Sequence, residues 1–169
     1  MIGGKTYLAI CWELLRDHST NEVKMDDIGQ SAGKNLGWLA GFICGDGSIC
    51  LDKAHIANGR FIYSPKVIIT NTDYNLILHS IEILKAFEIG HYITSKKTVN
   101  FTAYMIIIKG FKRVKKFLNL IIDYLEGKKK DQAKIILAWL KSRETTGCNV
   151  SYNEYELGLI DQLKSLRTR

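Results

Sequence analysis

The chain has 169 residues, of which 46% are hydrophobic and 24% charged, and this composition is typical of one compact globular domain rather than of a disordered chain. Lysine and arginine outnumber aspartate and glutamate by 24 to 17. The resulting net charge of +7 favours a polyanionic partner such as nucleic acid, although charge alone does not distinguish nucleic acid from an anionic membrane surface. The four cysteines form no CxxC pair and the four histidines are scattered, which excludes a zinc site of ordinary spacing.

The N-terminal stretch has too short an apolar part and the wrong charge pattern for a signal peptide or a membrane anchor. We therefore expect a soluble intracellular protein without a membrane partner, in the cytoplasm of a bacterium or phage-infected cell, or in an organelle. Residues 6–17 are expected to form a short amphipathic helix, and residues 18–34 a polar connector. Residues 1–34 would then precede a main domain over residues 35–169.

The main domain is expected to begin with an apolar helix over residues 35–45 and then to alternate between strands and helices. The patterns predict, in chain order, strands over 48–53 and 60–70, a helix over 73–87, strands over 91–96 and 100–109, and helices over 111–125, 131–143 and 151–166. Gly127 is expected to end the helix over 111–125, and Ser151 with Glu154 to form the capping box of the last helix. The order αββαββα predicts an α+β fold, in which an antiparallel saddle-shaped sheet carries helices on one face and leaves the other open.

The first helix of this domain has glycines four residues apart, at Gly37, Gly41 and Gly45, and it ends at Asp46. Glycine inside a helix costs up to about 1 kcal/mol relative to alanine, so another interaction must compensate for the stripe. A stripe without side chains allows a second helix to approach closely, and an apolar run of roughly ten residues is too short to cross a membrane. The stripe therefore predicts a seam at which two copies of this helix pack together.

Two copies packed about a two-fold axis would bring both Asp46 carboxylates side by side at the helix ends. Close carboxylates repel each other unless a hard cation lies between or beside them, and Mg²⁺ prefers such oxygen ligands. A divalent cation, Mg²⁺ or Mn²⁺, is therefore expected. The alternative is that Asp46 is an ordinary turn residue in a Gly-Asp-Gly sequence, but the glycine stripe favours the catalytic interpretation.

Residues 39–47, LAGFICGDG, resemble the LAGLIDADG motif of the homing endonucleases, and the αββαββα order resembles that family's fold from about residue 35 to 166. The motif occurs once, and single-motif members of the family are homodimers. The resemblance implies a homodimeric endonuclease that makes a metal-dependent double-strand break in a long, nearly palindromic DNA site. It also implies that Asp46 binds the catalytic metal with the backbone carbonyl of Gly45, and that Cys44 replaces a nonessential acidic residue of the motif.

Two further residues match positions that the family uses in the network around the metal. Asn71 fits the polar residue after the second strand, and Lys129 fits the lysine before a late helix, although Lys128 or Lys130 could be the equivalent. The amide would orient the attacking water, and the lysine would stabilise charge on the phosphate. Asn71 could instead, or in addition, cap the helix starting at Thr72, and a bare lysine run is more often a solvated helix start.

The open face of the sheet is the expected DNA-binding surface, because a two-stranded ribbon fits the major groove. Alternation places Val67 and Ile69 in the core and their neighbours outward, whereas the orientation of residues 100–109 is ambiguous. Each outward polar residue could be an ordinary solvent-facing one, and phosphate contact is more common than base readout for any single lysine. The expected DNA-binding residues are Ser48, Lys53, Arg60, Ser64, Lys66, Ile68, Thr70, Thr94, Lys96 and Lys97, and the expected dimer-interface residues are Gly37, Ala40, Gly41 and Cys44.

Three other functions compete with the endonuclease hypothesis. An RNA-splicing maturase or a DNA-binding regulator could keep the fold without cutting, and bifunctional maturases also keep the acidic residue. A structural dimerisation protein would use the glycine stripe but would leave the basic sheet unexplained. The presence of Asp46 favours the endonuclease, and cleavage of a DNA target in the presence of Mg²⁺ distinguishes these functions.

Overall fold

The computed structural model describes residues 25–55, 59, 61–147 and 150–166, so the helix expected over residues 6–17 lies outside the described residues. The chain divides into two compact units, residues 1–32 and residues 33–169, and the sheet and the hydrophobic core belong to the second unit. No helix in these described ranges is long and apolar enough to cross a membrane.

Helix α2 (Met25–Asp46) carries the glycine motif and is longer than the sequence pattern predicts. The prediction of a polar connector is therefore wrong for residues 25–34, which are helical. The spacing of four residues continues upstream of Gly37 to Gly33, and Tyr124 lies against both glycines. A Cβ atom at Gly33 would lie 3.6 Å from the Tyr124 hydroxyl, and one at Gly37 would lie 3.8 Å from Tyr124 Cδ1. Packing of this ring compensates for the low helix propensity of the two glycines.

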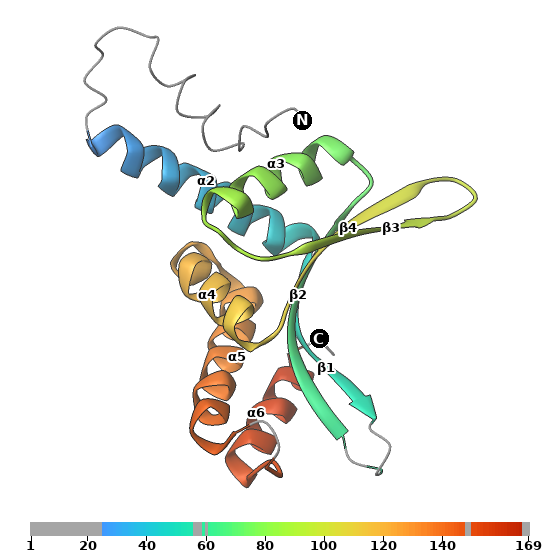
Figure 1. Cartoon of the computed structure of the whole chain (residues 1–169), viewed down its shortest axis with the longest axis vertical. Helices are drawn as coiled ribbons and strands as arrows, with labels where there is room; N and C mark the ends of the chain where they lie inside the picture. Colours follow the sequence, from blue (N-terminus) through green and yellow to red (C-terminus); the bar gives the residue numbers. More distant parts are fainter. Residues whose placement is uncertain (1–24, 56–58, 60, 148–149, 167–169) are drawn as a thin grey trace, which may run out of the picture. The chain divides into compact units, whose positions relative to one another are not determined.

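The sheet consists of four antiparallel strands in the order β1 (Gly47–His55), β2 (Phe61–Asn71), β4 (Thr102–Lys109) and β3 (Tyr92–Lys97) (Figure 1). Strand β1 follows α2 with no connecting residue, because the helix ends at Asp46 and the strand begins at Gly47. A Cβ atom at Gly47 would lie 2.7 Å from both Cα and the carbonyl oxygen of Ile43, so only glycine fits this junction.

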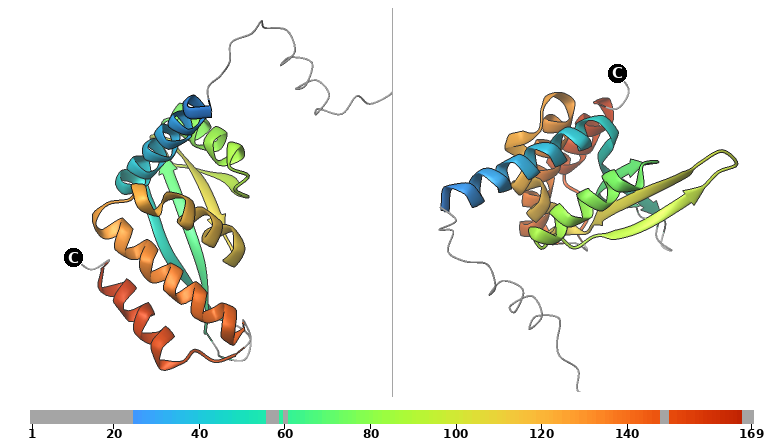
Figure 2. Two further views of the ribbon diagram at one scale, coloured as in Figure 1. Left: turned by 90° about the vertical axis from the view of Figure 1, so that its left-hand side faces the viewer. Right: turned by 90° about the horizontal axis from the view of Figure 1, so that it is seen from above.

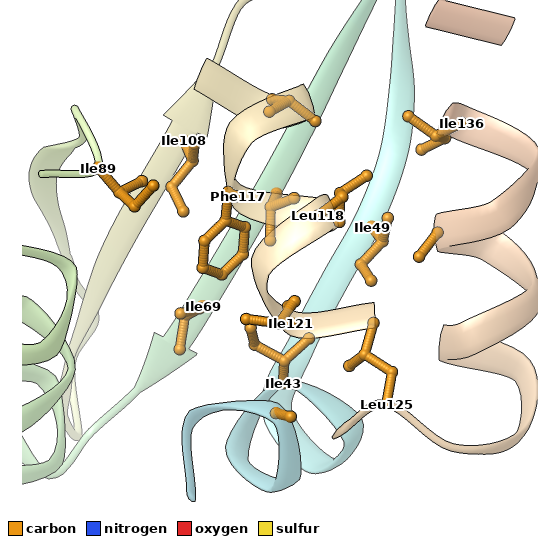
Figure 3. Close-up of a cluster of buried hydrophobic side chains, with 14 of the residues drawn as sticks. Ile43, Ile49, Ile69, Ile89, Ile108, Phe117, Leu118, Ile121, Leu125 and Ile136 are labelled. Carbon is orange, nitrogen blue, oxygen red and sulfur yellow. The ribbon is translucent and has the colours of Figure 1, made fainter. Parts of the chain in front are cut away.

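Helices α3 (Tyr74–Ala86), α4 (Phe111–Ile121) and α5 (Gly127–Thr146) pack against the sheet, and α6 (Glu154–Ser165) packs against α5 (Figure 2). The core between sheet and helices is apolar, and burying a side chain such as Phe117 contributes about 1.5–3 kcal/mol. The side chains labelled in Figure 3 are Ile43, Ile49, Ile69, Ile89, Ile108, Phe117, Leu118, Ile121, Leu125 and Ile136. The predicted α+β fold with the order αββαββα is confirmed.

The β3–β4 hairpin extends beyond the cover of the helices (Figure 1). Every residue of β3 is exposed, and Ile93 keeps 50% of its surface exposed although its partner Ile106 in β4 is fully buried. Strand β3 is therefore exposed on both of its faces, whereas β4 buries Ile106 and Ile108 on the helix side.

Two helix ends differ from the sequence prediction. Helix α4 ends at Ile121 and a 3-10 turn, η1 (Ile122–Tyr124), follows, so Gly127 does not end α4 but begins α5. Gly127 has a φ of 51°, in the left-handed region that favours glycine, and here this conformation occurs at the first residue of a helix. The capping box of α6 is formed by Asn153 and Glu156, two residues later than predicted.

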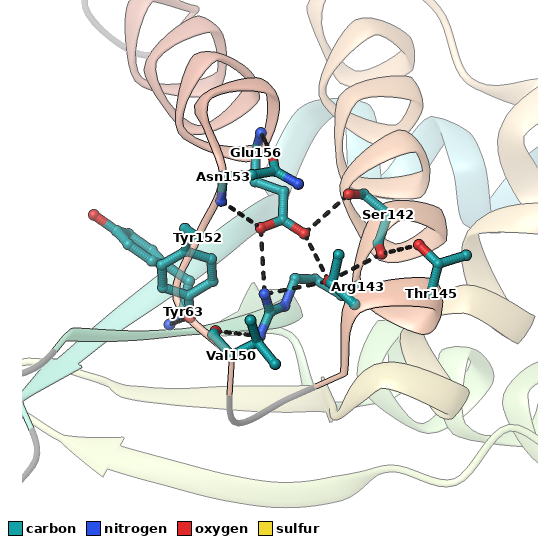
Figure 4. A network of polar contacts seen from close by, with 9 residues as sticks. Tyr63, Ser142, Arg143, Thr145, Val150, Tyr152, Asn153 and Glu156 are labelled. Carbon is teal, nitrogen blue, oxygen red and sulfur yellow. Dashed lines mark hydrogen bonds and ion pairs between the residues drawn. The ribbon is translucent and has the colours of Figure 1, made fainter.

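A buried ion pair joins α5 to α6 (Figure 4). Glu156 Oε2 lies 3.2 Å from Arg143 Nη1, and these side chains are 0% and 1% exposed. The Ser142 hydroxyl donates to Glu156 Oε1 at 2.9 Å, and the backbone N–H of Asn153 donates to Oε2 at 3.1 Å. Arg143 Nη2 donates to the carbonyl of Val150 at 3.0 Å. Hydrogen bonds therefore compensate most of the cost of burying this pair, although Arg143 Nε has no partner among the described residues.

Stability should depend on pH through this carboxyl. Burial alone would raise the pKa of Glu156, but the hydrogen bonds from Asn153 and Ser142 and the charge of Arg143 bring it below the ordinary value of 4.5. A carboxyl with a lowered folded pKa stabilises the protein above its unfolded pKa, and this contribution is lost as pH falls below about 4.5. We expect urea unfolding to show a smaller loss of stability on acidification in Glu156→Gln than in the wild type.

The matched control is Glu144→Gln, because Glu144 also pairs with a basic residue, Lys115, but is 51% exposed. This control should keep the pH dependence of the wild type. An equal loss of stability on acidification in Glu156→Gln and the wild type would contradict the assignment.

Candidate active site and DNA-binding face

Asp46 lies at the junction of α2 and β1, where its side chain is exposed. The last carbonyl groups of a helix lack partners within the helix, so the Gly45 carbonyl at this end is not committed to a helical hydrogen bond. A carboxylate and a backbone carbonyl, both hard oxygen ligands, are thus neighbours in the chain at one helix end. These are ligands that fit Mg²⁺ or Mn²⁺.

Asn71, the last residue of β2, is hydrogen-bonded through both ends of its side-chain amide. Its Nδ2 donates to Asp46 Oδ2 at 2.7 Å, and its Oδ1 accepts the backbone N–H of Asp73 at 2.7 Å. The suggestion that Asn71 caps the next helix is wrong, because the N-cap of α3 is Asp73, which accepts the N–H of Asn75 at 2.8 Å. The Asp73 N–H orients the Asn71 amide, so that its NH₂ group holds one oxygen of Asp46.

Lys129 reaches the same place from the first turn of α5. Its Nζ donates to the carbonyl oxygen of Gly47, the residue after Asp46, at 2.5 Å. Residues expected from the sequence to act together, Asp46, Asn71 and Lys129, therefore converge at the end of α2 although they belong to α2, β2 and α5. The Lys129 side chain thus contacts the backbone directly after Asp46.

One chain supplies few ligands for a metal at this position. The described part of the chain contains no group of three or more His, Cys, Asp or Glu residues that could hold a metal ion. A site with one carboxylate and one carbonyl is incomplete unless water, a substrate phosphate or a second chain adds ligands, and Mg²⁺ commonly keeps such mixed coordination.

The glycine stripe of α2 is divided between two environments. Gly37 lies against Tyr124 of the same chain, whereas a Cβ atom at Gly41 or Gly45 would have nothing within 4 Å. Ala40 is 0% exposed and belongs to the hydrophobic core, so its place among the interface residues is corrected: its side chain cannot reach a second chain. Cys44 is half-buried. The part of the stripe that is open to a second helix is therefore Gly41 and Gly45.

The burial pattern of β2 alternates as predicted, with Val67 and Ile69 fully buried and Lys66, Ile68 and Thr70 partly exposed. Residues paired directly across neighbouring strands share a face of the sheet, so the strand register shows which residues of β1, β3 and β4 lie on the same face as Lys66 and Thr70. Thr70 pairs with Met105 and Met105 with Thr94, so β3 and β4 are aligned with this open face. Of the predicted DNA-binding residues, this face holds Ser48, Ser64, Lys66, Ile68, Thr70, Thr94 and Lys96.

Two further predicted DNA-binding residues, Lys53 and Lys97, do not lie on this face. Lys53 pairs with the buried Tyr63 and Lys97 pairs with Thr102, so both lie on the face that carries the helices, and Lys53 Nζ lies 3.5 Å above the Phe61 ring. Arg60 lies outside the described residues. Near these hairpin ends the core does not extend far enough to bury side chains on the helix face. An exposed lysine there is therefore no sign of the open face.

Sequence reasoning missed several residues of the open face. The apolar run from Met105 to Ile108 hid the alternation of β4, which the pairing of Ile106 with Ile69 resolves. Sequence reasoning missed Asp52, Tyr92, Met105, Ile107 and Lys109, which the strand register places on this face.

No family model and no curated protein matches the chain, whereas solved structures do match it. The homing endonuclease I-CvuI, in complex with its target in the presence of 2 mM Ca, matches with a TM-score of 0.63 and 20% identity, over 81% of this chain and 84% of that chain. The group I intron-encoded homing endonuclease I-CeuI, complexed with DNA, matches with a TM-score of 0.58 and 17% identity, over 92% and 74% of the two chains.

The chain has the fold of the LAGLIDADG homing endonucleases. This fold was predicted from LAGFICGDG and the element order, and the prediction is confirmed. The meganuclease I-SmaMI bound to uncleaveable DNA is also similar, with a TM-score of 0.57 and 17% identity over 79% of this chain but only 43% of that chain. One copy of the homing-endonuclease fold thus matches less than half of I-SmaMI and most of I-CvuI.

Proposed function

We propose that the protein is a site-specific homing endonuclease, a homodimer that makes a metal-dependent double-strand break in a long, nearly palindromic DNA site. The observation that carries the proposal is the convergence at the end of α2, where Asn71 holds the Asp46 carboxylate and Lys129 contacts the adjacent Gly47 carbonyl. An exposed carboxylate oriented by an amide and accompanied by an ammonium group suits hydrolysis of a phosphodiester.

Each residue has a distinct task in this proposal. A bound divalent cation lowers the pKa of a coordinated water and stabilises negative charge on the scissile phosphate. Asp46 and the Gly45 carbonyl would provide the protein oxygen ligands. Asn71 holds the carboxylate through Asp46 Oδ2, and Asp46 Oδ1 accepts no hydrogen bond from the described residues. Lys129 places its positive charge beside the same helix end, where charge develops on the phosphate.

The second subunit completes the site by symmetry. Gly41 and Gly45 form an open strip on α2, and close packing of two such strips brings one Asp46 from each chain toward the two-fold axis. Each Asp46 then serves one DNA strand. The open face of the sheet, with Lys66, Lys96 and Lys109, would lie in the major groove on each side of that axis.

The test is selection followed by cleavage. The full-length protein is bound to a pool of randomised DNA duplexes in Ca²⁺, the recovered sequences are aligned, and the consensus is incubated with the protein and Mg²⁺. We expect a nearly palindromic consensus, cleavage of both strands, and affinity that falls steeply with salt. A selected site that is bound but never cut in Mg²⁺ or Mn²⁺ would contradict the endonuclease and favour a regulator. Specific binding to structured RNA without DNA selection would favour a maturase.

Replacing Asn71 by alanine should lower the cleavage rate about 10- to 100-fold, because residues that orient metal ligands commonly contribute this much. Affinity for the selected site in Ca²⁺ should remain near that of the wild type, since Asn71 is not on the open face. Asn75→Ala removes an exposed asparagine from the first turn of α3 and should cleave normally. Equal activity of the Asn71 and Asn75 variants would contradict the role of Asn71.

A further inference from the structure

The open face of the sheet contains one carboxylate, Asp52, among the described strand residues that share it. Asp52 Oδ2 lies 2.7 Å from Lys66 Nζ, and the two side chains are 39% and 19% exposed. They are diagonal neighbours, because Asp52 pairs with Ser64 and Cys50 pairs with Lys66. The hydrogen bond to Asp52 raises the pKa of Lys66, so this lysine stays charged while it is held in place.

A carboxylate is an unexpected group on a surface that binds DNA. DNA phosphates repel a carboxylate. Because the Lys66 ammonium lies 2.7 Å from the Asp52 carboxylate, a phosphate bound by Lys66 would also lie close to Asp52. Base edges in the major groove do not carry this penalty, because they offer hydrogen-bond donors as well as acceptors. The pair is therefore better suited to a base pair than to the backbone.

The geometry of the pair matches one base pair in particular. In a G·C pair, guanine O6 accepts and cytosine N4 donates, and because they are hydrogen-bonded to each other these atoms lie about 2.9 Å apart. Lys66 Nζ and Asp52 Oδ2 present a donor and an acceptor at 2.7 Å. Thymine O4 and adenine N6 have a similar spacing, but guanine adds N7 as a second acceptor for the ammonium, and thymine has a methyl group beside O4.

We propose that Asp52 and Lys66 together read one G·C base pair in each half of the DNA site, Lys66 donating to guanine and Asp52 accepting from cytosine N4. The proposal rests on the proposed function and names determinants of its sequence specificity. Because the pair is already formed without DNA, little side-chain order has to be gained on binding. Because both subunits carry it, the G·C preference must occur at two positions related by the two-fold axis.

An alternative role for Asp52 is structural. Lys66 pairs directly with Lys109 in β4, and like charges directly opposite each other destabilise a sheet, so Asp52 could serve only to neutralise Lys66. A structural role changes stability or overall affinity. A reading role changes the preference at one base pair.

The experiment compares wild type, Asp52→Asn and Lys66→Gln by binding to randomised duplexes in Ca²⁺, with thermal melting to establish that each variant folds. Asp52→Asn should lose about tenfold or more of the discrimination for cytosine at one position per half-site. Lys66→Gln should move the preference at that same position from guanine toward adenine, because glutamine pairs with adenine N6 and N7. Preferences at other positions should stay unchanged.

Glu144→Gln is the matched control, because the Lys115–Glu144 pair has the same 2.7 Å separation but joins α4 to α5, which cover the opposite face of the sheet. It should leave every base preference unchanged. The proposal is overturned if both sheet variants keep the wild-type preferences or lose affinity equally for all sequences, or if the position is A·T in the wild type. If the wild type selects no sequence at all, the proposed function fails and the reading role with it.

Discussion

Replacing Asp46 by asparagine is expected to reduce DNA cleavage by about three orders of magnitude or more while binding to the selected site in Ca²⁺ stays near wild type. The substitution removes the proposed anionic metal ligand at the end of α2 but changes no residue of the open sheet face. Asn71 can still hydrogen-bond to the amide oxygen, so the local structure should survive. Cleavage is measured on a linear duplex with Mg²⁺ and then with Mn²⁺.

Asp161→Asn provides the matched control, because Asp161 is an exposed carboxylate of α6 that pairs only with Lys164 among the described residues. It should cut at the wild-type rate. Cleavage by Asp46→Asn at a rate close to that of the control would refute the assignment of Asp46.

A covalently linked dimer of one wild-type and one Asp46→Asn chain extends this test to the division of work between subunits. If each subunit serves one strand independently, the dimer should convert a supercoiled plasmid with the target into nicked circles. If both Asp46 residues hold a shared cation, nicking should be suppressed as well. Efficient linearisation of the plasmid would contradict one Asp46-centred site for each strand.

Replacing Gly41 by leucine is expected to convert the proposed dimer into monomers and thereby to abolish the proposed double-strand cleavage. Nothing lies within 4 Å of a Cβ atom at Gly41, so leucine fits the single chain and should even favour the helix by about 1 kcal/mol. In a helix seam, however, the leucine would prevent the two backbones from approaching. Sedimentation velocity at several protein concentrations measures the effect.

The control for this variant is Gly158→Leu in α6, because Gly158 is also an exposed helical glycine with nothing within 4 Å of its Cβ position. Its oligomeric state should match the wild type. If Gly41→Leu remains a dimer at the same concentrations, the dimer interface must lie on another surface.

The parts of the fold in which apolar residues recur with a simple period could be predicted from the sequence. Burial alternates along β2 as expected, because one face of that strand packs against helices and the other does not. The contacts of Asp46 with Asn71, and of Lys129 with the next residue, join segments far apart in sequence. The motif resemblance allowed these residues to be grouped, which neither composition nor periodicity could do.

Other features depend on partners that no local pattern reveals. Residues 25–34 were assigned to a connector because the segment is polar and contains Gly29 and Gly33, yet it is helical, and Tyr124 from a distant turn packs against Gly33. Ala40 was assigned to the dimer interface because it lies beside the glycine stripe, but it is buried in the core of the same chain. The pairing of Asp52 with Lys66 needed the strand register, because sequence separation hides diagonal neighbours.

The alternation in β2 also bears on how such a protein changes over generations. Substitutions at Val67 or Ile69 leave cavities in the core and cost folding free energy, whereas substitutions at Ser64, Lys66 or Thr70 alter a partly solvated surface at little cost. A lineage can therefore accumulate changes on the open side of each strand while the helix side preserves the scaffold. If that open side binds DNA as proposed, new target sequences become accessible by gradual drift, and the same separation gives an engineer a set of positions to randomise without endangering the fold.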